Sequence, residues 1–298
     1  FRAYYVGITQ TKILTVNSIV MLLSNVALNY CLIFGKGGFP AAGIAGAAIA
    51  SSVSEAVSLL FFIIYTSMTA DKRKYGFRRA FTLRPHLLKG MLSISGWTMV
   101  QSFISVSIWF IFFLAIEHLG ERPLAVTNIV RNISALLIMV ISAFATTAGA
   151  LISNQIGAGE QRCLFKTCGM TLKLTYAILI PLLIILCLFP ESVLRAFTDS
   201  PSLIAASVNS VYVMASSTLI MAPSFILFNA VSGTGNTKAG FIMEMISLAV
   251  YTAVIYYGII RLKPDVALCW FSEHVYGVTL IFLAWWYLKS GKWRGKKV

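Results

Sequence analysis

Four ionisable side chains lie well inside long apolar stretches of this 298-residue sequence, at Glu55, Arg131, Glu244 and Glu273. A charge at the centre of a bilayer costs roughly 2.5–3.5 kcal/mol on insertion scales, so these side chains are unfavourable facing lipid. We therefore expect them to face the protein interior. Buried carboxyl groups of this kind bind protons or cations, or else serve as hydrogen-bonded structural groups.

Two of the four, Glu55 and Arg131, have two interpretations each. Glu55 lies about 15 Å into its apolar stretch, near the bilayer midplane. It is interpreted either as a structural carboxylic acid or as a carboxylate that binds a proton or a cation. Arg131 either forms a structural bridge with Glu273 or Glu244, or presents its charge to an anionic substrate. Glu244 lies close to the start of its stretch, so we expect its side chain to extend toward the membrane surface.

Further polar residues share helical faces with these four. Asn128, Arg131 and Asn132 follow the spacing of one helical face, and Glu244, Ser247 and Tyr251 follow another. Polar side chains inside membrane helices line cavities or form helix–helix hydrogen bonds. Other candidates for a cavity lining are Gln101, Ser105, Asn209, Tyr212 and Ser216.

From these residues we predict a substrate or ion pathway and a hinge. The predicted pathway comprises Glu55, Gln101, Asn128, Arg131, Glu244, Tyr251 and Glu273. Pro223 lies inside an apolar stretch, where it frees a backbone carbonyl group and can bend a helix, so it is the candidate gating hinge.

The composition requires membrane helices to carry these residues. Hydrophobic residues make up 58% of the chain and charged residues only 11%, whereas soluble domains have about a quarter of their residues charged. Apolar stretches of this length must be helices, because backbone polar groups cannot be left unpaired in lipid. We predict an all-α membrane protein with eight transmembrane helices, at residues 13–34, 45–68, 91–116, 124–152, 165–189, 202–230, 239–260 and 266–288.

The net charge of +14 lies in the loops and predicts an orientation. Most Lys and Arg residues fall in the stretches 1–12, 69–90, 153–173 and 289–298, which the positive-inside rule places in the cytoplasm. We expect a multi-pass protein of the bacterial cytoplasmic (inner) membrane with both ends of this chain cytoplasmic. The basic run at 71–79 is interpreted as an anchor on anionic lipid rather than as a nucleic-acid surface.

No motif indicates an enzyme. The sequence lacks HExxH and GxSxG patterns and any nucleotide-binding loop, and its three His residues have no metal-ligand spacing. The five Cys residues are scattered without a CxxC pair. We therefore expect no catalytic residue, no bound metal and no cofactor apart from a coupling ion.

An internal repeat predicts the domain organisation. Gln10-Thr11-Lys12 and its apolar stretch resemble Asn236-Thr237-Lys238, and Ser54-Glu55-Ala56-Val57 resembles Ser272-Glu273-His274-Val275. Repeats of this kind place substrate sites between the halves of membrane transporters. We predict a two-helix remnant of an N-terminal bundle (1–68), a basic cytoplasmic linker (69–90) and a complete six-helix C-terminal bundle (91–298), with four further helices, or their equivalent, missing upstream.

Three groups of residues resemble the multidrug and toxic-compound extrusion (MATE) transporters. The first is Asn29-Tyr30, Gly35, Phe39-Pro40 and Gly43 to Ala50, which look like the junction of the family's fifth and sixth helices. The second is Leu119-Gly120, Leu124-Ala125, Asn128-Ile129 and Gln155 to Gly159, which look like its eighth helix. The third is Gly233 to Lys238, between its tenth and eleventh helices.

The resemblance implies helices five to twelve of a twelve-helix antiporter built from two six-helix bundles. Its activity would be export of small organic solutes or drugs across the lipid bilayer by alternating access, in exchange for Na⁺ or H⁺. The family's acids of the seventh and tenth helices are absent here, where Val106 and Met221 stand, so the coupling ion stays open. The alternatives are a flippase for lipid-linked sugars, which would explain Arg131 as a phosphate contact, and a fragment that does not transport.

Overall fold

The computed structural model describes residues 1–8, 10–69 and 85–294, and all regular structure in these ranges is helical. Eight helices of this part are long and apolar enough to cross a membrane. They coincide with the predicted stretches to within a few residues, which confirms the predicted fold class. The chain divides into two compact units, Phe1–Pro85 and His86–Val298, and we describe each by itself.

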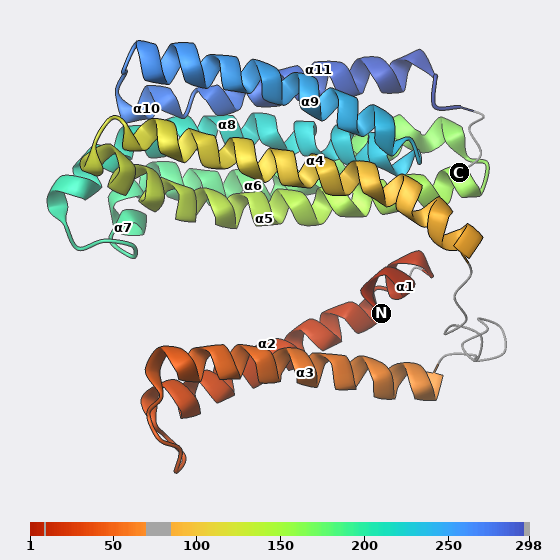
Figure 1. Cartoon of the computed structure of the whole chain (residues 1–298), viewed down its shortest axis with the longest axis horizontal. Coiled ribbons are helices and arrows are strands. Elements are labelled where there is room, and N and C mark those ends of the chain that lie inside the picture. Colours follow the sequence, from red (N-terminus) through yellow and green to blue (C-terminus); the bar gives the residue numbers. More distant parts are fainter. Residues whose placement is uncertain (9, 70–84, 295–298) are drawn as a thin grey trace. The chain divides into compact units, whose positions relative to one another are not determined.

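The first unit is a helical hairpin preceded by a short helix. It contains α1 (Arg2–Gly7), α2 (Lys12–Phe34) and α3 (Gly43–Thr69) (Figure 1). A Cβ atom on Gly46 of α3 would meet the backbone carbonyl of Leu32, so this glycine lets α2 and α3 approach closely. The sequence pattern of small residues at this position is thus a packing feature.

Neutral polar contacts join the helices of this first unit. Asn17 Nδ2 donates to Ser58 Oγ at 2.8 Å, and Ser58 Oγ lies 3.1 Å from Asn17 Oδ1. The Tyr5 hydroxyl and Thr66 Oγ1 are 2.8 Å apart. These partners satisfy side chains that are buried and would otherwise be costly.

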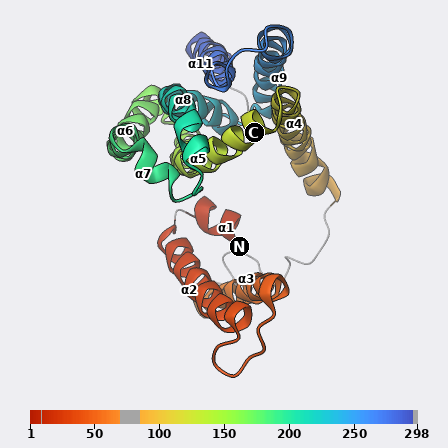
Figure 2. The same ribbon diagram turned by 90° about the vertical axis from the view of Figure 1, so that its left-hand side faces the viewer.

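The second unit is a bundle of six long helices with short connecting turns (Figures 1 and 2). The elements are α4 (Pro85–Glu117), α5 (Glu121–Gly157), a 3₁₀ turn (Gln161–Cys163), α6 (Leu164–Leu188), α7 (Pro190–Leu194), α8 (Pro201–Gly233), α9 (Thr237–Val254), a π-helical segment (Ile255–Arg261), α10 (Val266–Cys269) and α11 (Ser272–Ser290). Helix α8 is central, because it packs against α5, α6, α9 and α11.

Two different kinds of packing hold this bundle together. Helices α5 and α8 approach through their backbones, since a Cβ atom on Gly233 would meet the carbonyl of Gly149. Helix α4 is attached through long side chains instead, as in the ring contacts of Trp97 with Phe241 (5.1 Å) and Phe112 with Trp270 (5.7 Å).

Local sequence signals explain where α8 and α9 begin and end. Pro201 stands in the first turn of α8, where its missing N–H costs nothing. Asn236 caps α9 by accepting a hydrogen bond from the Ala239 N–H, so the Gly233 to Lys238 segment is a helix break as the sequence indicates. Pro223 lies inside α8, which continues as one helix.

Part of the predicted linker is helical. The predicted cytoplasmic linker 69–90 lies mostly outside the described residues, as does the basic run 71–79, but residues 85–90 belong to α4. Pro85 suits the first turn of a helix, so the helix begins there rather than at 91.

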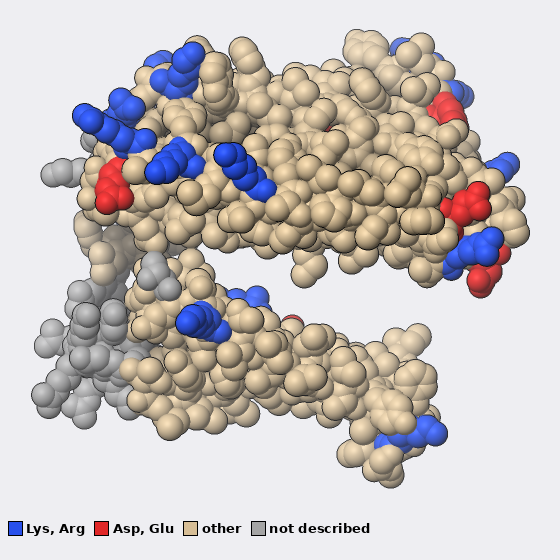
Figure 3. Space-filling view, turned by 180° about the vertical axis from the view of Figure 1, so that it is seen from behind, with Lys and Arg blue, Asp and Glu red and all other residues tan. Residues whose placement is uncertain are grey.

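The charges of the second unit separate between its two ends. Blue Lys and Arg side chains gather at the end where α5 finishes and α6 begins, and most acidic side chains lie at the opposite end (Figure 3). The intervening surface is apolar, as expected of a body that crosses a membrane.

Candidate functional site: two crossed glutamate–tyrosine pairs

Helices α9 and α11 are joined by two reciprocal carboxyl–phenol hydrogen bonds. Tyr276 of α11 donates from its hydroxyl to Glu244 Oε1 of α9 at 2.9 Å. Tyr251 of α9 donates from its hydroxyl to Glu273 Oε1 of α11, also at 2.9 Å. The two phenol rings meet edge to face with centroids 5.8 Å apart. Each helix therefore supplies one carboxyl group and one phenol to a single cluster.

Helical spacing produces this crossed arrangement. Glu244 and Tyr251 are seven residues apart, and Glu273 and Tyr276 are three apart, so each pair lies on one face of its helix. The predicted face of Glu244, Ser247 and Tyr251 is observed, and all three side chains are buried. The phenol of Tyr276 was missed by our sequence analysis, although its spacing from Glu273 could have revealed it.

Glu244 is a buried carboxyl group with one oxygen unpaired. Only 4% of the residue is exposed, and its Oε2 atom has no hydrogen-bond partner among the described residues. We expected this side chain to extend toward the membrane surface, which is wrong, because Ser105 and Tyr276 both donate to Oε1 and hold it inside the bundle.

A cavity of about 250 Å³ adjoins the two pairs. Both glutamates, both tyrosines and Ser105 line it, together with apolar side chains of α4, α5, α8 and α9. Val106 and Met221 also line it, the two positions where the resemblance places the acids of the family's seventh and tenth helices. The carboxyl groups of this chain thus reach the same cavity from two different helices, α9 and α11.

The Ser105 hydroxyl lies between two acceptors. Its oxygen is 2.9 Å from Glu244 Oε1 and 2.9 Å from the backbone carbonyl of Gln101 on its own helix. A hydroxyl group carries one proton, so it donates to only one of these acceptors at a time. A charged carboxylate accepts hydrogen bonds more strongly than a backbone carbonyl, so Glu244 is the preferred acceptor while it is ionised.

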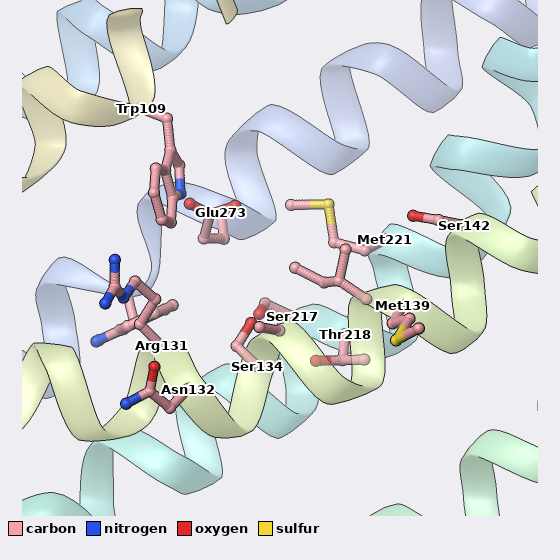
Figure 4. Close-up of a pocket in the computed structure, with 13 residues that line it drawn as sticks. Trp109, Arg131, Asn132, Ser134, Met139, Ser142, Ser217, Thr218, Met221 and Glu273 are labelled. Carbon is pink, nitrogen blue, oxygen red and sulfur yellow. The ribbon is translucent and has the colours of Figure 1, made fainter. Parts of the chain in front are cut away.

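A larger cavity of about 650 Å³ contains Arg131 (Figure 4). In that view Trp109, Arg131 and Glu273 gather at one side, while Met139, Met221 and Thr218 lie at the other. Glu273, Trp109, Ile138 and Met221 line both this cavity and the smaller one. The two cavities therefore share a wall that carries a carboxyl group.

Arg131 has aromatic neighbours instead of acidic ones. Its guanidinium carbon lies 5.3 Å from the Phe113 ring centroid and 6.0 Å from that of Trp109. No ion pair joins Arg131 to a carboxyl group anywhere in the described residues. The predicted structural bridge to Glu273 or Glu244 is thus wrong, because both carboxyl groups take tyrosine partners.

The remaining predicted site residues do not belong to the two glutamate–tyrosine pairs. Glu55 is exposed on α3 of the first unit. Asn128 is half-buried one turn before Arg131, and Asn132 lines the larger cavity instead. Gln101 contributes its backbone carbonyl to Ser105. The prediction that Asn209 lines a cavity stays a prediction. Ser216 and Tyr212 make contacts between helices: Ser216 Oγ lies 2.9 Å from His274 Nε2, and the Tyr212 hydroxyl lies 3.5 Å from the Cys187 carbonyl.

Charged groups in the cavities of a membrane-spanning helical bundle are typical of solute and ion pathways. Residues 98–257 match the family model described as MatE, and the chain belongs to this family. It is 25% identical over 243 residues to the "uncharacterized transporter YisQ" of Bacillus subtilis, covering 78% of this chain and 50% of YisQ. It is also 25% identical over 291 residues to the "probable multidrug resistance protein NorM" of Thermotoga maritima, covering 92% of this chain and 59% of that protein.

Solved structures share the fold. A MATE transporter described as an outward-facing conformation superposes with a TM-score of 0.82 at 16% identity, over 94% of this chain and 62% of that one. A MATE structure in a straight conformation gives a TM-score of 0.79 at 15% identity. The chain spans about half the length of the curated relatives, and somewhat under two thirds of the solved ones.

Proposed function

We propose that the protein containing this chain is a secondary transporter that exports small organic solutes in exchange for H⁺ or Na⁺. The crossed glutamate–tyrosine pairs form its ion-binding element. The observation that carries this proposal is the shared wall: Glu273 faces both the small cavity that holds Glu244 and the large cavity that has room for a solute. An ion and a solute that compete for one carboxyl group are the simplest basis of exchange.

The unpaired Oε2 atom of Glu244 is the expected point of ion binding. A buried carboxylate oxygen without a partner is strongly unfavourable, and either a proton or a cation would relieve that cost. Because Glu244 Oε1 already accepts from Ser105 and Tyr276, the second oxygen is the atom left for the ion. Hydroxyl oxygens of Ser105, Tyr251 and Tyr276 supply further possible ligands for Na⁺ in the same cavity.

Ion binding would change how α4 is held. When Glu244 is charged, the Ser105 hydroxyl donates to it across helices; when Glu244 is neutralised, the same hydroxyl is free to donate to the Gln101 carbonyl. Helix α4 is held through side-chain contacts, and this hydrogen bond is one of them. We propose that α4 moves during the transport cycle.

The charge distribution supports an orientation. We propose that the basic end, where α5 ends and α6 begins, faces the cytoplasm of a bacterial inner membrane. Export would then carry solute from the basic end to the opposite end. Cysteine accessibility at Gln161, which is half-buried in the 3₁₀ turn after α5, measures this orientation.

The test is solute transport into proteoliposomes that contain the native protein, with the gradients of H⁺ and Na⁺ imposed one at a time. Glu244→Gln and Glu273→Gln should each abolish gradient-driven transport while leaving membrane insertion unchanged. Glu160→Gln is the matched control, because Glu160 is exposed in the loop after α5. The gradient that drives transport identifies the ion. Gradient-driven transport at the native rate in both Glu244→Gln and Glu273→Gln would overturn the proposal.

Arg131 favours a second candidate function. A guanidinium group in a cavity without an acidic partner suits a phosphate, so a flippase for lipid-linked sugars deserves a direct test. Transbilayer movement of a fluorescent polyprenyl diphosphate sugar in the same proteoliposomes, without any ion gradient, would favour this function over solute export.

A further inference from the structure

We infer that the 650 Å³ cavity is a binding site for aromatic zwitterions, whose anionic group binds Arg131 and whose cationic group binds Glu273. This inference deepens the proposed transport function by naming the class of solute. The inference rests on the proposed function in one respect: Glu273 binds both the ion and the solute.

Arg131 lines the larger cavity. Its ring contacts with Phe113 and Trp109 are favourable for a cation, but they leave its formal charge uncompensated. A planar guanidinium group recognises carboxylate and phosphate groups through paired hydrogen bonds. A ligand that brings an anionic group to Arg131 therefore supplies the partner that no described side chain provides.

Glu273 lies on the same side of the cavity as Arg131 (Figure 4). Tyr251 donates to its Oε1 atom, and its Oε2 atom accepts no hydrogen bond from a described residue. A singly charged cation would be attracted by Glu273 and repelled by Arg131, and an anion would meet the reverse. A ligand that carries both charges close together interacts favourably with both side chains.

The remaining lining suits an apolar aromatic body. Ile138, Met139 and Met221 supply apolar and polarizable surface away from the charged end, and Trp109 offers an exposed ring. Thioether and aromatic side chains contact ligand rings favourably. The volume lies within the range of roughly 300–1,000 Å³ typical of small-molecule sites.

Three matched probes test the inference. Naphthylalanine is a zwitterion, its methyl ester is a cation, and its N-acetyl derivative is an anion, with one ring system throughout. We expect calorimetry on the purified protein, at fixed pH and without any gradient, to give the zwitterion about tenfold or greater preference over each derivative, as befits one added charged hydrogen bond.

Variants assign the preference to the two side chains. Arg131→Gln should remove the preference for the zwitterion over the ester, and Glu273→Gln should remove the preference over the N-acetyl derivative. Arg131→Lys, which keeps the charge, should retain most of the discrimination. Thermal unfolding of each variant establishes that the fold persists, and Glu160→Gln, in the exposed loop after α5 and outside both cavities, is the neutral control.

Several outcomes would overturn the inference. Equal binding of the three probes, tightest binding of the ester, or binding only of a polyprenyl diphosphate added to the same assay would each do so. Failure here is separable from failure of the proposed function, because coupling to an ion gradient is measured with Glu244→Gln, at a residue that does not line the larger cavity.

Discussion

The helix pairs α2–α3 and α9–α11 correspond in the internal repeat, yet they treat their glutamates differently. Glu55 on α3 is exposed, whereas Glu273 on α11 accepts a hydrogen bond from Tyr251 and lines two cavities. The contacts between α2 and α3 are neutral, as in Asn17 with Ser58, while those between α9 and α11 involve carboxyl groups.

The difference follows from the number of helices that surround each glutamate within its own unit. Two helices shield a side chain only along their common face, so the α2–α3 pair buries small neutral groups there. In the second unit, side chains of α4, α5 and α8 line a cavity together with those of α9 and α11. Enclosure is what turns a carboxyl group into a candidate ion site, because desolvation makes its charge state depend on a ligand.

The largest effect on stability should come from closing the space at a helix crossing. Gly233→Ala places a methyl group against the Gly149 carbonyl, and we expect a loss of about 3 kcal/mol, at the upper end of overpacking. Gly46→Ala, against the Leu32 carbonyl, should cost less, because the α2–α3 hairpin has fewer neighbours that prevent it from shifting.

Thermal unfolding in detergent measures both variants. Gly169→Ala on α6 is the control, since no atom lies within 4 Å of its added Cβ atom. It should be neutral or slightly stabilising, because alanine favours helices over glycine. Equal losses of stability in Gly233→Ala and Gly46→Ala would contradict the expectation that the α2–α3 hairpin shifts more easily than the α5–α8 crossing.

A smaller effect is expected from removing one phenol of the crossed pairs. Tyr276→Phe deletes the donor to Glu244 Oε1 and should lower the free energy of unfolding by about 2 kcal/mol, as for a lost hydrogen bond to a charged group. Tyr212→Phe, whose hydroxyl is 3.5 Å from the Cys187 carbonyl, is the matched control. No change in Tyr276→Phe would contradict a structural contribution of the pair.

The neutral contact of the first unit should be weaker still. Asn17→Ala removes both hydrogen bonds with Ser58 and should cost about 1 kcal/mol, the usual net value for neutral groups. A double-mutant cycle with Ser58→Ala isolates the coupling energy. A coupling as large as that between Tyr276 and Glu244 would remove the energetic distinction between neutral and carboxyl contacts.

Glu55→Gln should have the smallest effect on stability. Exposed substitutions usually change the free energy of unfolding by within about 0.5 kcal/mol, and Glu55 is exposed on its helix. Glu273→Gln should change it by more, because its partner Tyr251 is buried. A large loss in Glu55→Gln would mean that the exposed side chain has an energetic role that the first unit by itself does not reveal.

Much of the architecture follows from the sequence. An apolar stretch of some twenty residues matches the thickness of a bilayer, and in lipid it must be helical to pair its backbone N–H and C=O groups. The eight spans and the break at Gly233 to Lys238 are examples. The start of α4 at Pro85 was missed, because its first residues are not apolar enough to distinguish them from a linker.

The site was predictable only in part. Glu244, Tyr251, Glu273 and Arg131 stood out because polar groups within apolar stretches are rare. Tyr276 was missed although it lies three residues after Glu273. Ser105 did not stand out, because hydroxyl groups are common on membrane helices and no spacing rule links α4 to α9. Helix rotation and packing decide that Arg131 meets rings and Glu244 meets hydroxyl groups.

The π-helical segment at the end of α9 has a consequence for the phase of this helix. A π turn carries an extra residue, so side chains beyond Val254 fall behind the angular positions that a continuous α-helix would give them. Ile255 and Ile259 stay buried, whereas the paired rings of Tyr256 and Tyr257 point outward. Helix α9 therefore directs Glu244 and Tyr251 toward α11. The π-helical segment that follows it turns Tyr256 and Tyr257 outward.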